Sequence, residues 1–259
     1  MTQTKKLLVG VLTLGMLAAA CGGGDGHVAT TASTAATAAT AAIEPGDGGH
    51  YDPVVDPADF VDRIDNPFFP LIPASKWVYE GTADGKPEHD EVAVTSERKT
   101  ILGIPAIVVR DTVSADGAVT EDTFDWYAQD RKGNVWYLGE DSKTYDHGTL
   151  TGTEGSWEAG VDGARPGIVM PAHPKPGDAN RQEFSPGVAE DLGQVTHVDT
   201  RIRVPAGRYR HVIVTKEWSP LEPRIVEQKR YAPGIGLVAE DTLQGGHDRT
   251  RLVAFTPGS

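Results

Sequence analysis

The feature that most constrains the fold is a regular succession of strand-like segments separated by turn dipeptides. Asp84-Gly85, Asp116-Gly117 and Gly133-Asn134 each lie between two segments that are rich in Val, Ile and Thr or that alternate polar and apolar residues. Such dipeptides accept the backbone angles of tight turns, so each flanking pair of segments predicts an antiparallel hairpin. The chain lacks a strand–helix–strand rhythm, which argues against Rossmann-type and TIM-barrel enzymes.

Segments of this kind continue along most of the chain. The expected strands are 76–82, 88–101, 105–114, 119–130, 135–140, 194–204, 208–218, 225–232, 236–243 and 249–255. About ten strands within roughly 210 residues predict a single all-β, mainly antiparallel domain, which is either a β-barrel or a half-barrel.

Three segments depart from this pattern. Asp56 followed by Pro57 and Asp59 has the residues of a capped helix start, so we expect one short N-terminal helix over 57–64. Residues 66–73 combine three prolines with Phe and aliphatic residues, which predicts an extended plug that packs against, or closes, one end of the domain. Residues 155–187 are rich in Gly and Pro and are expected to form a long irregular loop.

The only cysteine of the chain, Cys21, follows a basic start and an uncharged run over 7–20. That run is too short to span a bilayer and is typical of a signal peptide. Leu17-Ala18-Ala19-Ala20-Cys21-Gly22 resembles a bacterial lipobox, although Ala18 stands where Leu is usual. The resemblance implies a lipid, including palmitate, on Cys21; the alternative is an ordinary signal peptide that leaves a free thiol. A single cysteine also excludes an intramolecular disulfide and a Cys-based zinc cluster.

These patterns divide the chain into three parts. Residues 1–20 are the expected signal peptide, and 21–49 carry the lipidated Cys21 and an Ala/Thr/Gly-rich tether. Residues 50–259 form the expected β domain. A flexible coil of that tether's length reaches roughly 30 Å. The expected location is therefore the bacterial cell envelope, with the domain anchored to the membrane and exposed outside the cytoplasm.

The charge of the chain bears on its partners. It has 37 acidic and 24 basic residues and a formal net charge of −13, which becomes −15 once Lys5 and Lys6 are removed with the signal peptide. Acidic chains repel phosphate backbones, so a nucleic-acid-binding protein of this charge would need a local basic stripe. We expect no window of the sequence to supply one, and nucleic acid is therefore not an expected partner.

The densest signal for a functional site lies between Arg110 and Glu140. Arg110 and Asp111 interrupt an apolar strand, and the period-two alternation places Glu121 and Asp125 on one face of the next strand. Acidic residues on strands usually face water, and this is the simpler interpretation. In the other, these carboxylates line a barrel mouth and are matched by Arg110.

The Gly/Pro-rich loop supplies the second signal, because Trp157 and Met170 are costly to expose. They either cover the core or form the apolar wall of a pocket together with Trp126 and Trp136. The candidate ligand-binding residues are Arg110, Asp111, Glu121, Asp125, Trp126, Glu140, Trp157, Glu158 and Met170.

Common catalytic motifs are missing. The sequence has no Gly-x-Ser-x-Gly elbow, no Gly-x4-Gly-Lys loop and no His-Glu-x-x-His pair, and its eight histidines are scattered. No metal site or cofactor is expected, although a divalent cation held by carboxylates stays open as an alternative.

Five strings in the folded part resemble a group of uncharacterised bacterial secreted lipoproteins. They are NPFFPLIPASKWVYEG, VVRDTV, DTFDWYAQDRKGNVWYLGE, GSWEAGVDGARPGIVMPA and YAPGIGLV. This resemblance implies a shared fold and export route but no established activity. The turn at 204–207 and the segment 231–238 also resemble LolA-like half-barrel lipoproteins, which implies an apolar concavity for a hydrophobic ligand.

The sequence therefore predicts a membrane-anchored extracytoplasmic lipoprotein that acts as a non-enzymatic module. It would bind a small or hydrophobic ligand or serve as an accessory protein of the envelope. The alternative is a hydrolase or lyase in which Glu121 works with Asp125 or Glu140, with or without a divalent cation. A third interpretation is an acidic coat protein without a ligand.

Overall fold

The structure is a computed structural model, and it describes residues 50–259. The predicted signal peptide, the lipidation at Cys21 and the tether lie outside the described residues. Within 50–259, no helix combines the length and the apolar character needed to cross a membrane.

The described part consists almost entirely of strands. In chain order its elements are the 3-10 helix η1 (Pro57–Asp59) and the strands β1 (Phe60–Val61), β2 (Lys76–Ala83), β3 (Lys86–Ile101), β4 (Ile104–Ala115), β5 (Ala118–Asp130), β6 (Val135–Asp146), β7 (Thr149–Gly152), β8 (Trp157–Glu158), β9 (Arg165–Met170), β10 (Ala179–Arg181), β11 (Glu183–Phe184), β12 (Leu192–Val204), β13 (Gly207–Trp218), β14 (Val226–Ala232), β15 (Gly236–Gln244) and β16 (Arg249–Thr256).

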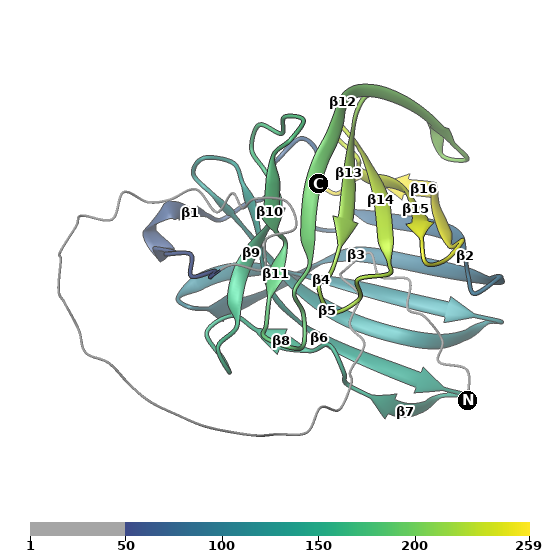
Figure 1. The fold of residues 1–259 in the computed structure, drawn as a ribbon, viewed down its shortest axis with the longest axis horizontal. Coiled ribbons are helices and arrows are strands. Elements are labelled where there is room, and N and C mark those ends of the chain that lie inside the picture. The colour runs from purple at the N-terminus through teal and green to yellow at the C-terminus, as the bar shows by residue number, and fades with distance from the viewer. Residues whose placement is uncertain (1–49) are drawn as a thin grey trace.

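One antiparallel sheet curls into a nearly closed barrel (Figure 1). Its strands follow the order β10-β12-β13-β14-β15-β16-β2-β3-β4-β5-β6-β9-β11, with β1 beside β5 and with β7 and β8 beside β6. The two ends of this order are neighbours in the chain, because residues 179–181 pair with β12 and residues 183–184 pair with β9. This one segment thus links the two edges of the sheet. The predicted all-β antiparallel domain is confirmed.

Local sequence accounts for the hairpins. The turns Asp84-Gly85 and Asp116-Gly117 have φ angles of 49° and 76°, and of 52° and 77°. Two positive φ angles in succession define the turn that matches the twist of a two-residue hairpin, and Asp-Gly favours it. Leu102-Gly103 and His147-Gly148 form the same kind of turn, although Leu and His at the first position do not predict it.

The N-terminal helix is shorter than the sequence predicts. Asp56 caps it by accepting a hydrogen bond from the amide of Ala58 at 2.9 Å, but the helix is the single 3-10 turn η1. The chain then extends as β1, where Phe60 pairs with Asp130 at the end of β5. Pairing with the sheet outweighs a cap whose helix would have been only two turns long.

The Gly/Pro-rich segment 155–187 is more ordered than expected, because it contains β8, β9, β10 and β11. Both β8 and β9 pair with β6, whose backbone groups would otherwise form an open edge. Strands of two to six residues are too short to produce a readable alternation.

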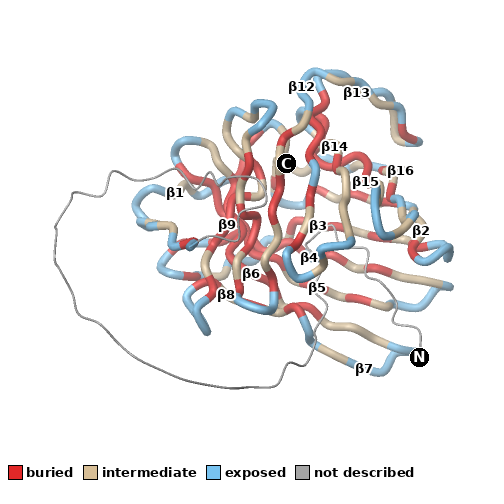
Figure 2. Tube along the Cα trace, in the orientation of Figure 1, coloured by how far each residue is buried: buried red, intermediate tan, exposed pale blue. Residues whose placement is uncertain are grey.

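Residues 66–73 pack against the barrel, which agrees with one of the two arrangements that the sequence predicts. The Asn66 side chain donates to the carbonyls of Gly133 and Pro171 at 2.8 and 3.2 Å. The Phe69 ring lies 5.3 Å from the Tyr127 ring and 6.4 Å from the Tyr231 ring. We call residues 66–73 the plug; its apolar side chains join the buried core that runs through the middle of the molecule (Figure 2).

Candidate functional site

Strand alternation directs a row of polar side chains into the barrel. On β5, Glu121, Thr123, Asp125 and Tyr127 share one face, and all four are at most 5 % exposed. Asp125 lies opposite Glu140 of β6 in the sheet. The acids predicted to share a face therefore face inward.

Other strands add acids to this row. We call Asp90 of β3, Asp111 of β4, Glu121 and Asp125 of β5, Glu140 of β6 and Glu183 of β11 the carboxyl cluster, and all six are buried. The charges that act most strongly on Asp111 are those of the carboxylates Asp90, Asp125 and Glu121. Mutual repulsion and burial both favour protonated carboxyls in such a cluster.

Asp90 and Asp111 act directly on each other within the cluster. Neither oxygen of Asp90, nor Oδ1 of Asp111, receives a hydrogen bond from an amide, hydroxyl or amine group. Burial raises the pKa of Asp90 to about 7, and burial together with the Asp90 charge raises the pKa of Asp111 well above its usual range. A proton carried by Asp111 and shared with Asp90 satisfies both groups.

Tyr137 connects two further members of the cluster. Its hydroxyl donates to Oδ1 of Asp125 at 2.5 Å and lies 3.2 Å from Oε2 of Glu140. Burial raises the pKa of Asp125 to about 7, and the Tyr137 hydrogen bond limits this rise. Burial also raises the pKa of Tyr137 well above its usual range, so its hydroxyl keeps its proton. The edge of Trp157 packs on Tyr137, and the indole N–H donates to Glu183 at 2.8 Å.

The barrel also holds a balanced ionic group for comparison. Lys229 of β14 lies 2.8 Å from Glu217 of β13 and 3.8 Å from Glu240 of β15. Burial would lower the pKa of Lys229, but the charges of Glu217 and Glu240 outweigh it and raise the pKa. These acids have a cation beside them, whereas Asp90 and Asp111 have one another.

A small cavity of about 40 Å³ lies between the plug and the carboxyl cluster. The side chains of Asp111 and Asp125 are its charged lining, and the rest is mainly aromatic and aliphatic. The remaining lining residues are Phe69, Pro70, Leu71, Trp77, Tyr79, Val92, Val109, Tyr127, Ile235, Gly236 and Leu237. The cavity thus has an apolar wall and two carboxyl groups that can accept hydrogen bonds from a ligand.

A wider surface cleft of about 550 Å³ lies between residues 61–65 and 129–133. Several of its charged side chains are already engaged: Arg63 pairs with Asp65 at 2.7 Å, and Arg131 donates to the carbonyl of Ala58 at 2.8 Å. None of the candidate ligand-binding residues lines this cleft, and neither of the two cavities reaches Tyr137 or Glu140.

The structure places the candidate residues from the sequence in three locations. Asp111, Glu121, Asp125, Glu140 and Trp157 come together inside the barrel. Arg110, Trp126 and Glu158 lie on the outer face. Met170 is fully buried in the core.

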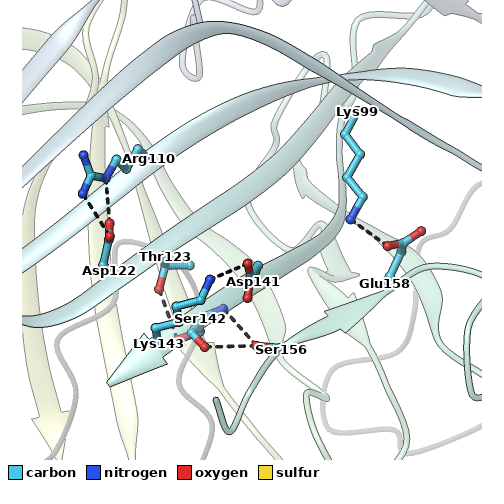
Figure 3. A network of polar contacts seen from close by, with 9 residues as sticks. All are labelled: Lys99, Arg110, Asp122, Thr123, Asp141, Ser142, Lys143, Ser156 and Glu158. Atoms are coloured by element: carbon cyan, nitrogen blue, oxygen red, sulfur yellow. Dashed lines mark hydrogen bonds and ion pairs between the residues drawn. The ribbon is translucent and has the colours of Figure 1, made fainter. Parts of the chain in front are cut away.

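Figure 3 shows why Arg110 does not meet the carboxyl cluster. Its guanidinium binds Asp122 through two hydrogen bonds of 2.7 and 2.9 Å on the outer face. On the same face, Lys99 pairs with Glu158 at 2.7 Å and lies 3.3 Å from the centre of a Trp126 ring. Adjacent strand residues point to opposite faces, which separates Arg110 from Asp111. Trp136 is held elsewhere, by a 3.0 Å hydrogen bond to Asp130.

Sequence reasoning missed Asp90, Tyr137 and Glu183. The sequence held a signal for Asp90, because Asp90 lies two and four residues before the apolar Val92 and Val94 and therefore shares their face of the strand. Tyr137 and Glu183 carried none, because a bulge next to Gly139 and the short β11 interrupt the alternation around them.

Among residues 50–259, no three His, Cys, Asp or Glu side chains are grouped so that they could hold a metal ion. The carboxyl cluster is therefore described without a cation.

Comparisons with known proteins add little beyond the fold. No protein-family model matches the chain, and no curated protein sequence is significantly similar to it. One similar solved structure is a Bacteroides fragilis NCTC 9343 protein inferred to be exported, with a YmcC-like fold; it has 16 % identity, a TM-score of 0.44, and coverage of 73 % of this chain and 99 % of the other. Another is an inferred lipoprotein of Parabacteroides distasonis ATCC 8503, with 13 % identity, a TM-score of 0.41, and coverage of 74 % and 99 %.

Proposed function

We propose that this protein is a lipid-anchored binding protein of the bacterial cell envelope. Its ligand would enter the barrel beneath the plug and would carry a compact apolar part and an amine or another hydrogen-bond donor. The observation that carries the proposal is the cavity between the plug and the carboxyl cluster, with an apolar wall and with Asp111 and Asp125 in its lining.

The carboxyl groups of the cavity favour a ligand that donates hydrogen bonds over a ligand that accepts them. Oδ1 of Asp111 receives no hydrogen bond from an amide, hydroxyl or amine group of the domain, so it is an acceptor that a ligand donor would engage. A carboxylate ligand would add a further negative charge beside Asp90, Asp111 and Asp125, and is disfavoured for that reason.

Access depends on the plug. At its start, the plug is held by the bonds of Asn66 to Gln129, Gly133 and Pro171. Beyond Asn66, its backbone bonds to other segments include those from the amide of Leu71 to Ile64 and from the amide of Gly234 to Pro67. Segments with few backbone hydrogen bonds open at low free-energy cost. A cavity of 40 Å³ is near the volume of one water molecule, so an organic ligand needs the plug to move.

The enzymatic alternative has weaker support. Tyr137, Asp125 and Glu140 have the groups for acid–base chemistry, but the cavity touches only Asp125 of the three. A general base must lie within hydrogen-bonding reach of its substrate. We therefore favour binding over catalysis.

The anchor is tested by labelling cells with radioactive palmitate. The protein purified from the membrane fraction should carry label, and Cys21→Ala should lose the label and appear in the soluble extracytoplasmic fraction. If Cys21→Ala is exported and still fractionates with the membrane as the parent does, this result would contradict the anchor.

The binding role is tested by native mass spectrometry of the full-length protein purified from its own cells in mild detergent. We expect a bound mass that is retained by the exposed control Asp116→Asn/Asp146→Asn and lost by Asp111→Asn/Asp125→Asn. If the cavity variant keeps the same bound mass, the ligand lies elsewhere and this proposal fails.

A further inference from the structure

The β12–β13 hairpin carries an unusual concentration of positive charge in an acidic protein. Residues 201–210 read RIRVPAGRYR and contain four arginines in a chain whose formal net charge is −13. We call Arg201, Arg203, Arg208 and Arg210 the arginine face. The sequence-based statement that no window supplies a basic stripe is wrong for this hairpin, because the alternation gathers its charges on one side.

The register of the hairpin sets these arginines directly against one another. Arg201 is opposite Arg210, and Arg203 is opposite Arg208. Residues opposite in an antiparallel pair have Cβ atoms about 5 Å apart, and like charges there destabilise the pair. All four side chains are exposed, and none makes an ion pair or a hydrogen bond within residues 50–259.

The opposite face of the hairpin holds it on the barrel. Ile202, Ala206 and Tyr209 pack against the buried core, and Val204 is buried. At the tip, the amide of Ala206 donates to the carbonyl of Leu252 on β16 at 3.0 Å. The arginine face therefore points away from the barrel, and the hairpin arches over the molecule at the upper right of Figure 1.

Nearby acids do not neutralise the arginine face. Asp199 lies where the hairpin bends, but its carboxylate pairs with His211 at 2.7 Å. The fold does not require positive charge at the exposed positions of the hairpin, since polar uncharged residues would fill these positions without the repulsion. An external anion explains the four arginines better than the packing of the domain does.

We propose that the arginine face docks on the anionic phospholipid surface of the membrane to which the chain is anchored. This choice of partner rests on the lipid anchor proposed above, which keeps the domain within a tether's length of that surface. Guanidinium groups bind phosphates through paired hydrogen bonds, and basic residues near an anionic membrane each add to its attraction. The rest of the acidic domain is repelled, so docking fixes which side faces the lipid.

The test uses the mature chain from residue 21 onward with Cys21→Ser, so that neither a lipid nor the apolar run over 7–20 contributes to binding. Its sedimentation is measured with vesicles of equal parts phosphatidylglycerol and phosphatidylcholine, and with vesicles of phosphatidylcholine alone. We expect binding only to the anionic vesicles, weaker at high salt. Replacing all four arginines by Gln should weaken it by about tenfold or more.

A matched control removes the same charge elsewhere, through Lys86→Gln, Lys132→Gln, Lys175→Gln and Arg224→Gln, all at exposed positions. It should bind the anionic vesicles nearly as the parent does. Circular dichroism checks folding, and Arg203→Gln/Arg208→Gln provides a milder second variant with an intermediate loss.

The proposal is overturned if the arginine variants bind anionic vesicles like the parent, or if the control loses as much. It is equally overturned if the protein does not bind the vesicles and the arginine variants instead lose binding to single-stranded DNA. The same holds if they instead lose self-association in ultracentrifugation. Because Cys21 is absent from the test, these outcomes are independent of the palmitate result for the anchor.

Discussion

Asp125 illustrates how a single position on a strand decides the chemistry of a side chain. The period-two alternation was enough to predict that it shares a face with Glu121. The sequence could not show that this face is the inner one, because acids on strands most often face water. The pairing of β3, β4 and β5 brings Asp90 and Asp111 beside them. Burial inside the curled sheet then raises the pKa of Asp125 to about 7.

This raised pKa predicts how stability depends on pH. Between the ordinary pKa of 3.8 and about 7, the folded protein keeps a proton on Asp125 that the unfolded chain has lost. The free energy of unfolding therefore falls as the pH rises through this range, and Asp90 acts in the same direction.

Asp125→Asn removes this titration and keeps an acceptor for Tyr137. Its unfolding free energy should fall less than that of the parent between about pH 5 and about pH 8, by roughly 1 to 3 kcal/mol. Urea titrations at the two pH values measure the difference, with Asp116→Asn in an exposed turn as the control. An unchanged pH dependence would show that Asp125 does not titrate in this range.

At the scale of elements, the strands and tight turns were largely predictable, because their signals are local. The segment 179–184 was not, since it pairs first with β12 and then with β9, which lie near opposite ends of the sheet order. Its closeness to β9 is visible at Gly167, where a Cβ atom would lie 2.2 Å from the carbonyl oxygen of Gln182. The closure of the barrel thus depends on a position without a side chain.

Gly167→Ala should force β9 and the 179–184 segment apart and lower the free energy of unfolding by about 2 kcal/mol or more. Gly207→Ala is the matched control, because its Cβ would meet only ordinary contacts, the nearest at 3.5 Å from Tyr209. Denaturant unfolding of both variants tests this. Equal stability of the two would mean that the closure tolerates displacement.

At the scale of the whole molecule, the barrel separates two kinds of charge. Acidic residues lie inside the barrel. There Lys229 forms ion pairs with Glu217 and Glu240, whereas Asp90 and Asp111 share a proton. The hairpin at the rim carries four arginines outward. The net charge of −13 conceals this division, which is why composition indicated an acidic surface and missed both features.

The central claim is that the cavity beneath the plug accepts a ligand with an apolar part and a donor group. The most direct measurement is the thermal unfolding of the full-length protein with increasing hexylammonium or, in parallel, hexanoate. Ligands that bind only the folded state raise Tm by an amount that keeps growing with the logarithm of the ligand concentration above Kd. We expect a concentration-dependent rise in Tm with hexylammonium, no rise with hexanoate, and loss of the rise in Asp111→Asn/Asp125→Asn. No rise with hexylammonium, or an equal rise in the cavity variant, would contradict the account.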